Sequence, residues 1–167
     1  KYVYEYGLTD QEHISVETLG GIKYLDLTVE DGKVLQVKVD MGEPILEAEK
    51  IPIVSEHDRV IDEPITVDGI EYRITGVSMG NPHDVLFIED VKGLDIEKVG
   101  PSFENHERFP KRINTEFVKV LDRNTVEMRV WERGSGETLA CGTGACATAV
   151  ACILNGLTEH EVTVKLL

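Results

Sequence analysis

Residues 132–156, ERGSGETLACGTGACATAVACILNG, place a cysteine in a glycine-rich turn directly before a run of small residues. The pattern predicts a helix after Cys141, with Thr143 as a candidate cap and glycines that let the backbone approach a ligand closely. The N–H groups at a helix start lack intrahelical partners and attract negative charge. This stretch therefore predicts a site that stabilises a thiolate or a ligand carboxylate.

The cysteines of this stretch have a second reading as core residues. A buried, inert thiol is the usual state of a cysteine outside disulfides, and it is the alternative for Cys141. Helical spacing predicts one apolar face that packs into the core, and both Cys146 and Cys152 are assigned to packing. The residues of that predicted face are Cys146, Ala149, Val150, Ile153 and Leu154.

Charged residues just before the turn indicate what the site binds. Glu132 offers an acceptor for an ammonium group, and Arg133 offers a forked donor for a carboxylate. The pair would suit an amino acid, and its alternative is a solvated strand end.

Two further polar positions are ambiguous by themselves. Asn81 and His83 lie in a Gly-Asn-Pro-His turn, where turn chemistry alone explains the sequence. His83 is either a surface histidine or an acid–base group that acts on the thiol. Asn114 either contacts a ligand or hydrogen-bonds to its own backbone.

The elements that must position these residues are mostly strands. Alternating residues and Asp-Gly turns predict two hairpins, one across Asp31-Gly32 and one across Asp68-Gly69. Residues 94–105 are expected to form a short helix whose continuity is weakened by Gly100-Pro101. A Pro- and acid-rich interruption from Met41 predicts a boundary between residues 1–40 and 41–167. Strands are expected at residues 13–18, 85–88, 116–121 and 125–131.

Composition narrows the classes of function. The 167 residues are 41% hydrophobic, enough for a core, and carry a net charge of −14, which disfavours nucleic acid as a partner. Apolar runs are too short for a membrane span, so we expect a cytoplasmic protein that does not bind membranes. Three cysteines within twelve residues fit a reducing compartment better than a disulfide framework or a zinc site.

Familiar cofactor and nucleophile motifs do not fit the sequence. A phosphatase-type loop would need arginine where Ala147 stands, and the phosphate-loop, zinc-protease and serine-hydrolase motifs are absent from the sequence. We therefore expect chemistry that uses neither a cofactor nor a metal.

Several motifs together resemble the diaminopimelate epimerase family. They are GNPH (residues 80–83), RINTEFV (112–118) and ERGSGETLACGTGACA (132–147), with shorter matches in DMGEP (40–44), GPSFENHERFP (100–110) and LNGL (154–157). The resemblance implies an α+β fold of two similar lobes, each a curled mixed sheet around a central helix. This chain would hold the tail of the first lobe and most of the second, which carries Cys141.

The resemblance also implies an activity and roles for residues. The family's enzymes convert LL-2,6-diaminopimelate to the meso isomer, in lysine and peptidoglycan biosynthesis, without pyridoxal phosphate or metal. Cys141 would be one of two opposed cysteines, and the other is expected upstream of Lys1. His83 and Glu132 would set the protonation of the thiols. Substrate would contact Asn81, Asn114, Glu132, Arg133, Gly142 and Thr143.

Two other functions stay open from the sequence. One is a related amino-acid racemase of the same fold, similar to proline racemase. The other is a lobe that does not catalyse by itself, because one thiol cannot serve both faces of a carbon. The oligomeric state, including a homodimer, also stays open.

Overall fold

A computed structural model describes residues 1–18 and 21–167 of the chain. The chain divides into two compact units, Lys1–Gly42 and Glu43–Leu167, and each is described by itself. No helix among the described residues is both long and apolar enough to cross a bilayer.

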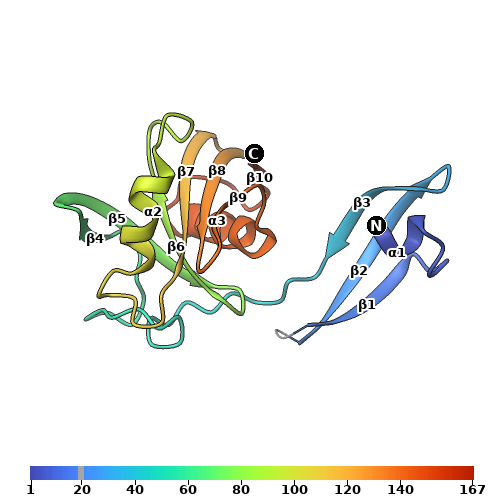
Figure 1. Ribbon diagram of the computed structural model, residues 1–167, viewed down its shortest axis with the longest axis horizontal. Coiled ribbons are helices and arrows are strands. Elements are labelled where there is room, and N and C mark those ends of the chain that lie inside the picture. The colour runs from blue at the N-terminus through green and yellow to red at the C-terminus, as the bar shows by residue number, and fades with distance from the viewer. Residues whose placement is uncertain (19–20) are drawn as a thin grey trace. The chain divides into compact units, whose positions relative to one another are not determined.

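The first unit is a three-stranded antiparallel sheet with one short helix (Figure 1). Its helix is α1 (Tyr2–Glu5), and its strands are β1 (His13–Thr18), β2 (Gly21–Glu30) and β3 (Lys33–Val39). Asp31 and Gly32 join β2 to β3 with φ angles of 49° and 74°. Positive φ at both central residues is the requirement of the tight hairpin turn that Asp-Gly predicts, so this hairpin is confirmed.

The second unit is built on one mixed sheet in the order β10-β8-β7-β6-β5-β4, with β9 paired to β8. Strands β6 and β7 are parallel, as are β8 and β10, whereas the other pairs are antiparallel. A mixed sheet with helices confirms the predicted α+β class. The strands are β4 (Glu63–Val67), β5 (Ile70–Ser78), β6 (Pro82–Phe87), β7 (Asn114–Asp122), β8 (Thr125–Glu132), β9 (Gly136–Thr138) and β10 (Thr163–Lys165).

Strand β6 begins earlier than the sequence indicates. The compact apolar run of residues 85–88 predicts a strand from Val85, but β6 starts at Pro82, so His83 belongs to the strand and not to the turn. Pairing explains the difference, because His83 lies opposite Val77 on β5 and opposite Asn114 on β7. Polar residues can extend a strand when both neighbours supply ladder partners.

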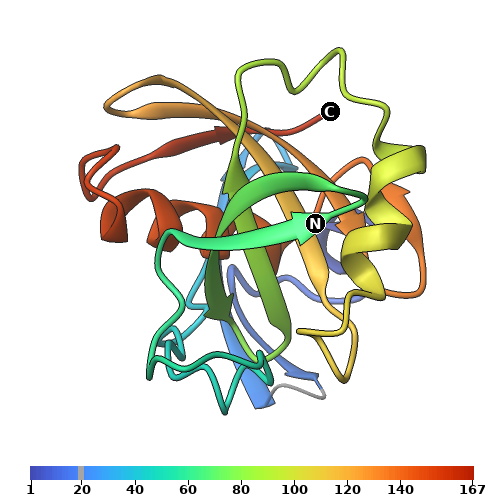
Figure 2. The same ribbon diagram turned by 90° about the vertical axis from the view of Figure 1, so that its left-hand side faces the viewer.

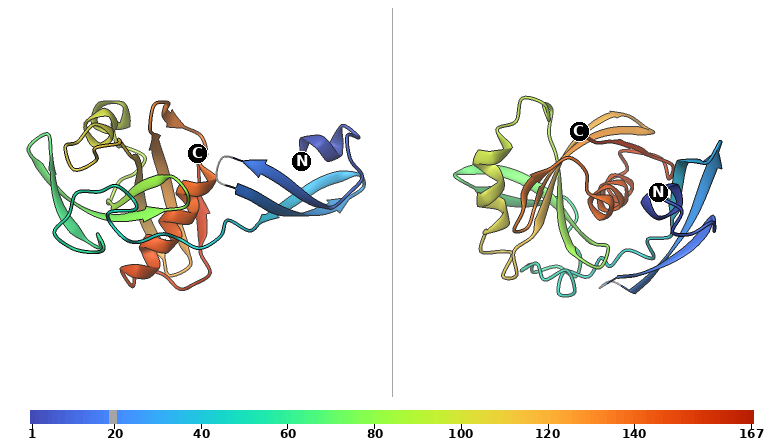
Figure 3. Two further views of the ribbon diagram at one scale, coloured as in Figure 1. Left: turned by 90° about the horizontal axis from the view of Figure 1, so that it is seen from below. Right: turned by 45° about the vertical axis from the view of Figure 1, so that its right-hand side comes forward.

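Helices α2 (Ile96–Glu104) and α3 (Gly142–Leu154) cover opposite faces of this sheet (Figures 1 and 3). Figure 2 shows the strands between the two helices. The α2 side holds the main apolar core, in which Phe103 packs edge-on against both Tyr72 and Phe117. The α3 side carries the polar residues that could do chemistry.

Helix α2 confirms the short helix expected within residues 94–105, and it continues through Pro101 without a break. Close packing explains why a glycine, Gly100, precedes this proline. A Cβ at that position would lie 2.3 Å from a ring carbon of Trp131, which packs on the helix there. The glycine therefore permits a close approach between α2 and the end of β8.

The buried face of α3 is not the predicted one. The five residues of the predicted face are all only half-buried. The residues that are buried are Gly144, Ala147, Thr148, Ala151 and Cys152. Small side chains let the helix lie close to the sheet, so contact distance decides the face and hydrophobicity does not.

The C-terminal end of α3 is tied to the sheet by a side chain. The amide nitrogen of Asn155 donates to Thr75 Oγ1 on β5 at 2.9 Å and to Ala151 O at 2.8 Å. Asn155 therefore both caps the helix and fixes it to the strand.

Candidate active site

Cys141 is the N-cap residue of α3. Its φ and ψ of −132° and 110° are extended, and its Sγ accepts a hydrogen bond from the Gly144 N–H at 3.3 Å. The thiol thus takes the capping role that the sequence assigns to Thr143. The Thr143 hydroxyl instead lies 3.4 Å from the same sulfur. Cys141 is 7% exposed, so its sulfur meets the helix start in a largely water-free position.

Opposing effects act on this thiol. Burial raises the pKa of Cys141 above its usual range, and the carboxylates of Glu116 and Glu132 raise it further, while the bonds from Thr143 and Gly144 lower it. Burial raises the pKa of Cys152 to about 11. Both residues are free thiols. At neutral pH most Cys141 is therefore the thiol, which suits a group that must both give and take a proton.

These pKa shifts predict an order of alkylation in the full-length protein. We expect iodoacetamide to modify Cys141 more slowly than an unfolded thiol at pH 8, because each unit of raised pKa removes roughly tenfold of the thiolate. The rate should increase as the pH rises through the Cys141 pKa, and Cys152 should stay unmodified until higher pH. Peptide mass spectrometry after timed labelling measures each site. Rapid labelling of Cys141 below pH 7 would contradict the prediction.

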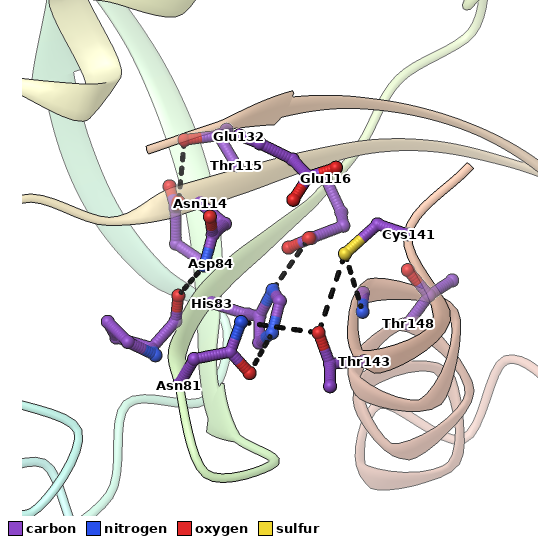
Figure 4. A network of polar contacts seen from close by, with 12 residues as sticks. Asn81, His83, Asp84, Asn114, Thr115, Glu116, Glu132, Cys141, Thr143 and Thr148 are labelled. Carbon is purple, nitrogen blue, oxygen red and sulfur yellow. Dashed lines mark hydrogen bonds and ion pairs between the residues drawn. The ribbon is translucent and has the colours of Figure 1, made fainter. Parts of the chain in front are cut away.

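Polar side chains connect Cys141 to strand β6 (Figure 4). The Asn81 amide nitrogen donates to Thr143 Oγ1 at 3.2 Å, and the Asn81 Oδ1 lies 3.1 Å from His83 Nε2. His83 is fully buried, so the reading as a surface histidine is wrong. The ring is held on its other side by Glu116, whose Oε1 lies 2.7 Å from Nδ1.

The remaining candidates gather at the adjoining ends of β7 and β8. Asn114 does not bond its own backbone: its amide donates to Pro82 O at 2.7 Å, and its Oδ1 accepts from the Arg133 N–H at 2.9 Å. Glu132 accepts a hydrogen bond from the Thr138 hydroxyl. The Arg133 guanidinium donates to Lys111 O at 2.9 Å. Both side chains therefore have hydrogen-bond partners, although the contact of the Arg133 guanidinium is exposed to solvent.

The candidate site residues fall into two sets of hydrogen-bonded side chains. Asn81, His83, Thr143 and Cys141 form one hydrogen-bonded set, and Asn114 connects β6 to the Glu132-Arg133 segment in the other. Gly142 is exposed at the start of α3, where the first N–H groups have no intrahelical acceptor. Arg133 has no hydrogen bond to Cys141 among the contacts of the described residues.

Sequence reasoning missed two carboxylates. Glu116 contacts His83, and Glu104 on α2 accepts from the Gly134 N–H at 2.9 Å and from Trp131 Nε1 at 2.7 Å. Both are buried, at 0% and 6% exposure. A charged residue next to the apolar pair Phe-Val inside a predicted strand was the signal available for Glu116.

A second polar cluster lies away from Cys141. Glu63 accepts hydrogen bonds from Ser55 at 2.8 Å and Arg108 at 2.6 Å, and it lies 2.9 Å from His57 Nδ1. Arg108 also donates to the carbonyls of Val54 and Pro64. Because these groups are engaged with one another across loops, the cluster braces the loops and is a poorer candidate for chemistry.

Comparisons with known proteins agree with the geometry. The family described as diaminopimelate epimerase matches residues 75–167. The diaminopimelate epimerase of Acetivibrio thermocellus is 59% identical over the whole chain, and that of Agathobacter rectalis is 60% identical over 99% of it. The chain spans 60% and 61% of the length of these two relatives.

Two solved structures share the fold at low sequence identity. A hydroxyproline epimerase from Agrobacterium vitis superposes with a TM-score of 0.64 at 17% identity, over 95% of this chain and 50% of that one. A probable proline racemase from Agrobacterium radiobacter gives 0.63 at 16% identity, over 94% and 50%. The likeness extends to the fold alone. The match of the family to more than half of the residues, Cys141 included, shows that the chain belongs to the diaminopimelate epimerase family.

Proposed function

We propose that the protein catalyses cofactor-independent epimerisation of LL-2,6-diaminopimelate to the meso isomer by proton transfer between two cysteines, with Cys141 as one of them. The observation that carries the proposal is the position of the Cys141 sulfur at the N-cap of α3, beside unpartnered helix N–H groups. Because the chain spans about 60% of the length of its relatives, we place the second cysteine in the part that it does not span.

The chemistry requires that the enzyme stabilise a carbanion next to a carboxylate. An α-proton is a very weak acid, so donors must already point at the carboxylate when charge moves onto it. The N–H groups of Gly142 and Thr143 would serve, each contributing on the order of 3 kcal/mol by analogy with oxyanion holes. A thiolate on one face removes the proton, and a thiol on the other face supplies one, so the centre inverts.

Recognition of the substrate is assigned to the other set. We propose that Glu132 accepts from the ammonium group and that Arg133 binds a carboxylate, with Asn81 and Asn114 as further contacts. His83 and Glu132 would adjust the protonation of the thiols. We also infer that the intact protein works in the cytoplasm and as an enzyme, with the residues 1–40 segment as the tail of the first lobe and 41–167 as most of the second.

The test is a deuterium incorporation assay with the full-length protein. Incubation with the LL isomer in D2O should give meso product that carries deuterium at the inverted α-carbon. Under the same conditions L-proline should stay unlabelled, because its secondary ammonium and single carboxylate lack the second half of diaminopimelate. Labelling of proline in place of diaminopimelate would favour the proline-racemase-like alternative. Failure to label either would reject the proposed activity.

A further inference from the structure

A continuous path of polar contacts runs from Glu116 to the sulfur of Cys141 (Figure 4). The successive distances are 2.7 Å from Glu116 to His83, 3.1 Å to Asn81, 3.2 Å to Thr143 and 3.4 Å to Cys141. The path joins β7, β6 and the β5–β6 turn to the start of α3. Glu116 lies at the far end and has no role in the function proposed above.

The donor and acceptor properties of these groups limit which atom donates in each contact of the path. The Asn81 Oδ1 accepts only, so His83 Nε2 must donate to it, and one proton lies between His83 Nδ1 and the Glu116 carboxylate. The pair is net neutral whichever atom holds that proton. Asn81 presents its N–H to Thr143 Oγ1, and that hydroxyl lies 3.4 Å from Cys141 Sγ, where it can donate its proton to a thiolate.

Packing places Glu116 against the first turn of α3. A Cβ on Gly144 would lie 2.6 Å from Glu116 Oε1 and 3.2 Å from Cys141 Sγ, so the missing side chain makes room for both. Glu116 is fully buried, and its Oε2 has no hydrogen-bond partner among the described residues. Burying a carboxylate with a histidine as its single hydrogen-bond partner costs free energy of folding. This cost favours a role for Glu116 other than stabilising the fold.

We propose that Glu116 is a positioning residue that fixes His83 as a donor to Asn81 and thereby directs the Thr143 hydroxyl onto the Cys141 sulfur. This inference rests on the proposed function in one respect, that Cys141 is the group whose protonation matters. Four titratable groups meet here: His83 on β6, Glu116 on β7, Glu132 on β8 and Cys141 at the start of α3. Asp84 points to the opposite face of the sheet, where it accepts from Thr115 at 2.7 Å.

Replacing Glu116 separates two effects of opposite sign. If Glu116 acted only as a nearby negative charge, its removal would make Cys141 a stronger acid. If it directs the hydroxyl, its removal releases His83 and Asn81, the donor to the thiolate is lost, and Cys141 becomes a weaker acid. The sign of the change therefore distinguishes the two roles.

The experiment measures the pH dependence of Cys141 alkylation by iodoacetamide in the full-length protein without substrate. For Glu116→Leu we expect the pKa of Cys141 to rise by up to about one unit, as for the loss of one hydrogen bond to a charged group. At pH values below that pKa, alkylation should then be up to roughly tenfold slower than in wild type. Thr143→Val should give the same shift, and Thr143→Ser should stay near wild type. The double variant Glu116→Leu/Thr143→Val should shift no further than Thr143→Val, because both act through one hydroxyl.

The control is Asp84→Asn, which changes a fully buried carboxyl on the other face and should leave the Cys141 profile in place. An unchanged or lowered pKa in Glu116→Leu, or additive shifts in the double variant, would overturn the proposal. If Glu116→Leu does not fold, the variants Thr143→Val and Thr143→Ser still test whether the Thr143 hydroxyl acts on the Cys141 sulfur. Equal pH profiles of Cys141 alkylation in these two variants would reject the proposal. The labelling needs no turnover, so loss of the proposed epimerase activity and failure of this inference are read separately.

Discussion

The full-length protein with Cys141→Ala is expected to exchange the α-proton of diaminopimelate roughly a thousandfold more slowly than wild type. A positioned acid–base group contributes about 10²–10⁴-fold to proton transfer, and alanine has no group that could take the proton. The loss should appear in the turnover rate more than in substrate binding, because alanine at position 141 leaves the groups proposed to bind substrate in place. Deuterium incorporation from D2O, followed by mass spectrometry, measures the rate.

The matched control is Cys146→Ala, which removes a cysteine from the same helix. Cys146 is half-buried and lies one and a half turns along α3, so this variant should exchange at the wild-type rate. Wild-type exchange by Cys141→Ala would show that this thiol is not the base. Equal losses in both variants would indicate damage to the helix and not to the chemistry.

The second large effect is expected at Glu104, on the opposite side of the sheet from Cys141. Its carboxylate accepts from the Arg112 guanidinium at 2.8 Å, from the Gly134 N–H and from the Trp131 indole. In Glu104→Ala the indole and the amide lose their acceptor. We expect the free energy of unfolding to fall by about 3 kcal/mol, because hydrogen bonds to a charged group contribute about 1.5–3 kcal/mol each and are not additive.

Urea unfolding of the full-length protein measures this loss, and Glu97→Ala is the matched control. Glu97 is exposed on the same helix, so its replacement should change stability by no more than about 0.5 kcal/mol. The Glu104 variant should also bind substrate more weakly, because Trp131 and Gly134 flank the Glu132-Arg133 segment. A loss below about 1 kcal/mol would mean that water replaces the carboxylate at little cost.

Much of the fold could be predicted from the sequence, for a local reason. The Asp-Gly turns require left-handed backbone at two successive residues, and Asp68 and Gly69 adopt φ angles of 51° and 79° as Asp31 and Gly32 do. Alternation then fixes the strands on both sides. These signals lie within a few residues of the elements they define.

The face of α3 could not be predicted because the information is not in the helix. Ranking by hydrophobicity selects Val150, Ile153 and Leu154, but the residues that are buried are glycine, alanine, threonine and cysteine. How closely a helix approaches a sheet depends on the side chains of both. A run of small residues indicates that the helix packs close to a neighbouring element, but it does not indicate which face of the helix makes the contact.

The site was predictable only in part, for a similar reason. Cys141 and Thr143 are two positions apart in one glycine-rich turn, and the turn by itself predicts a site for a thiolate or a carboxylate. Asn81, in contrast, contacts Thr143 from 62 positions away in the sequence. Glu116 gave no local sign of its contact with His83, because the parallel pairing of β6 and β7 brings them together. Long-range pairing thus decides between a turn histidine and a buried one.

The bond between Asn155 and Thr75 holds the C-terminal end of α3, and the bond from Asn81 to Thr143 holds its start. The thirteen residues of α3 separate Asn155 from Cys141, a length of about 20 Å at about 1.5 Å per residue. The contacts at the start of the helix belong to the candidate site, so the far anchor is the one of the two that lies outside it. A slip of about 1 Å there would carry to the sulfur, and misplacement of that size can cost about a hundredfold in rate. Tuning of this site by distant substitutions should therefore concentrate at the C-terminal end of the helix.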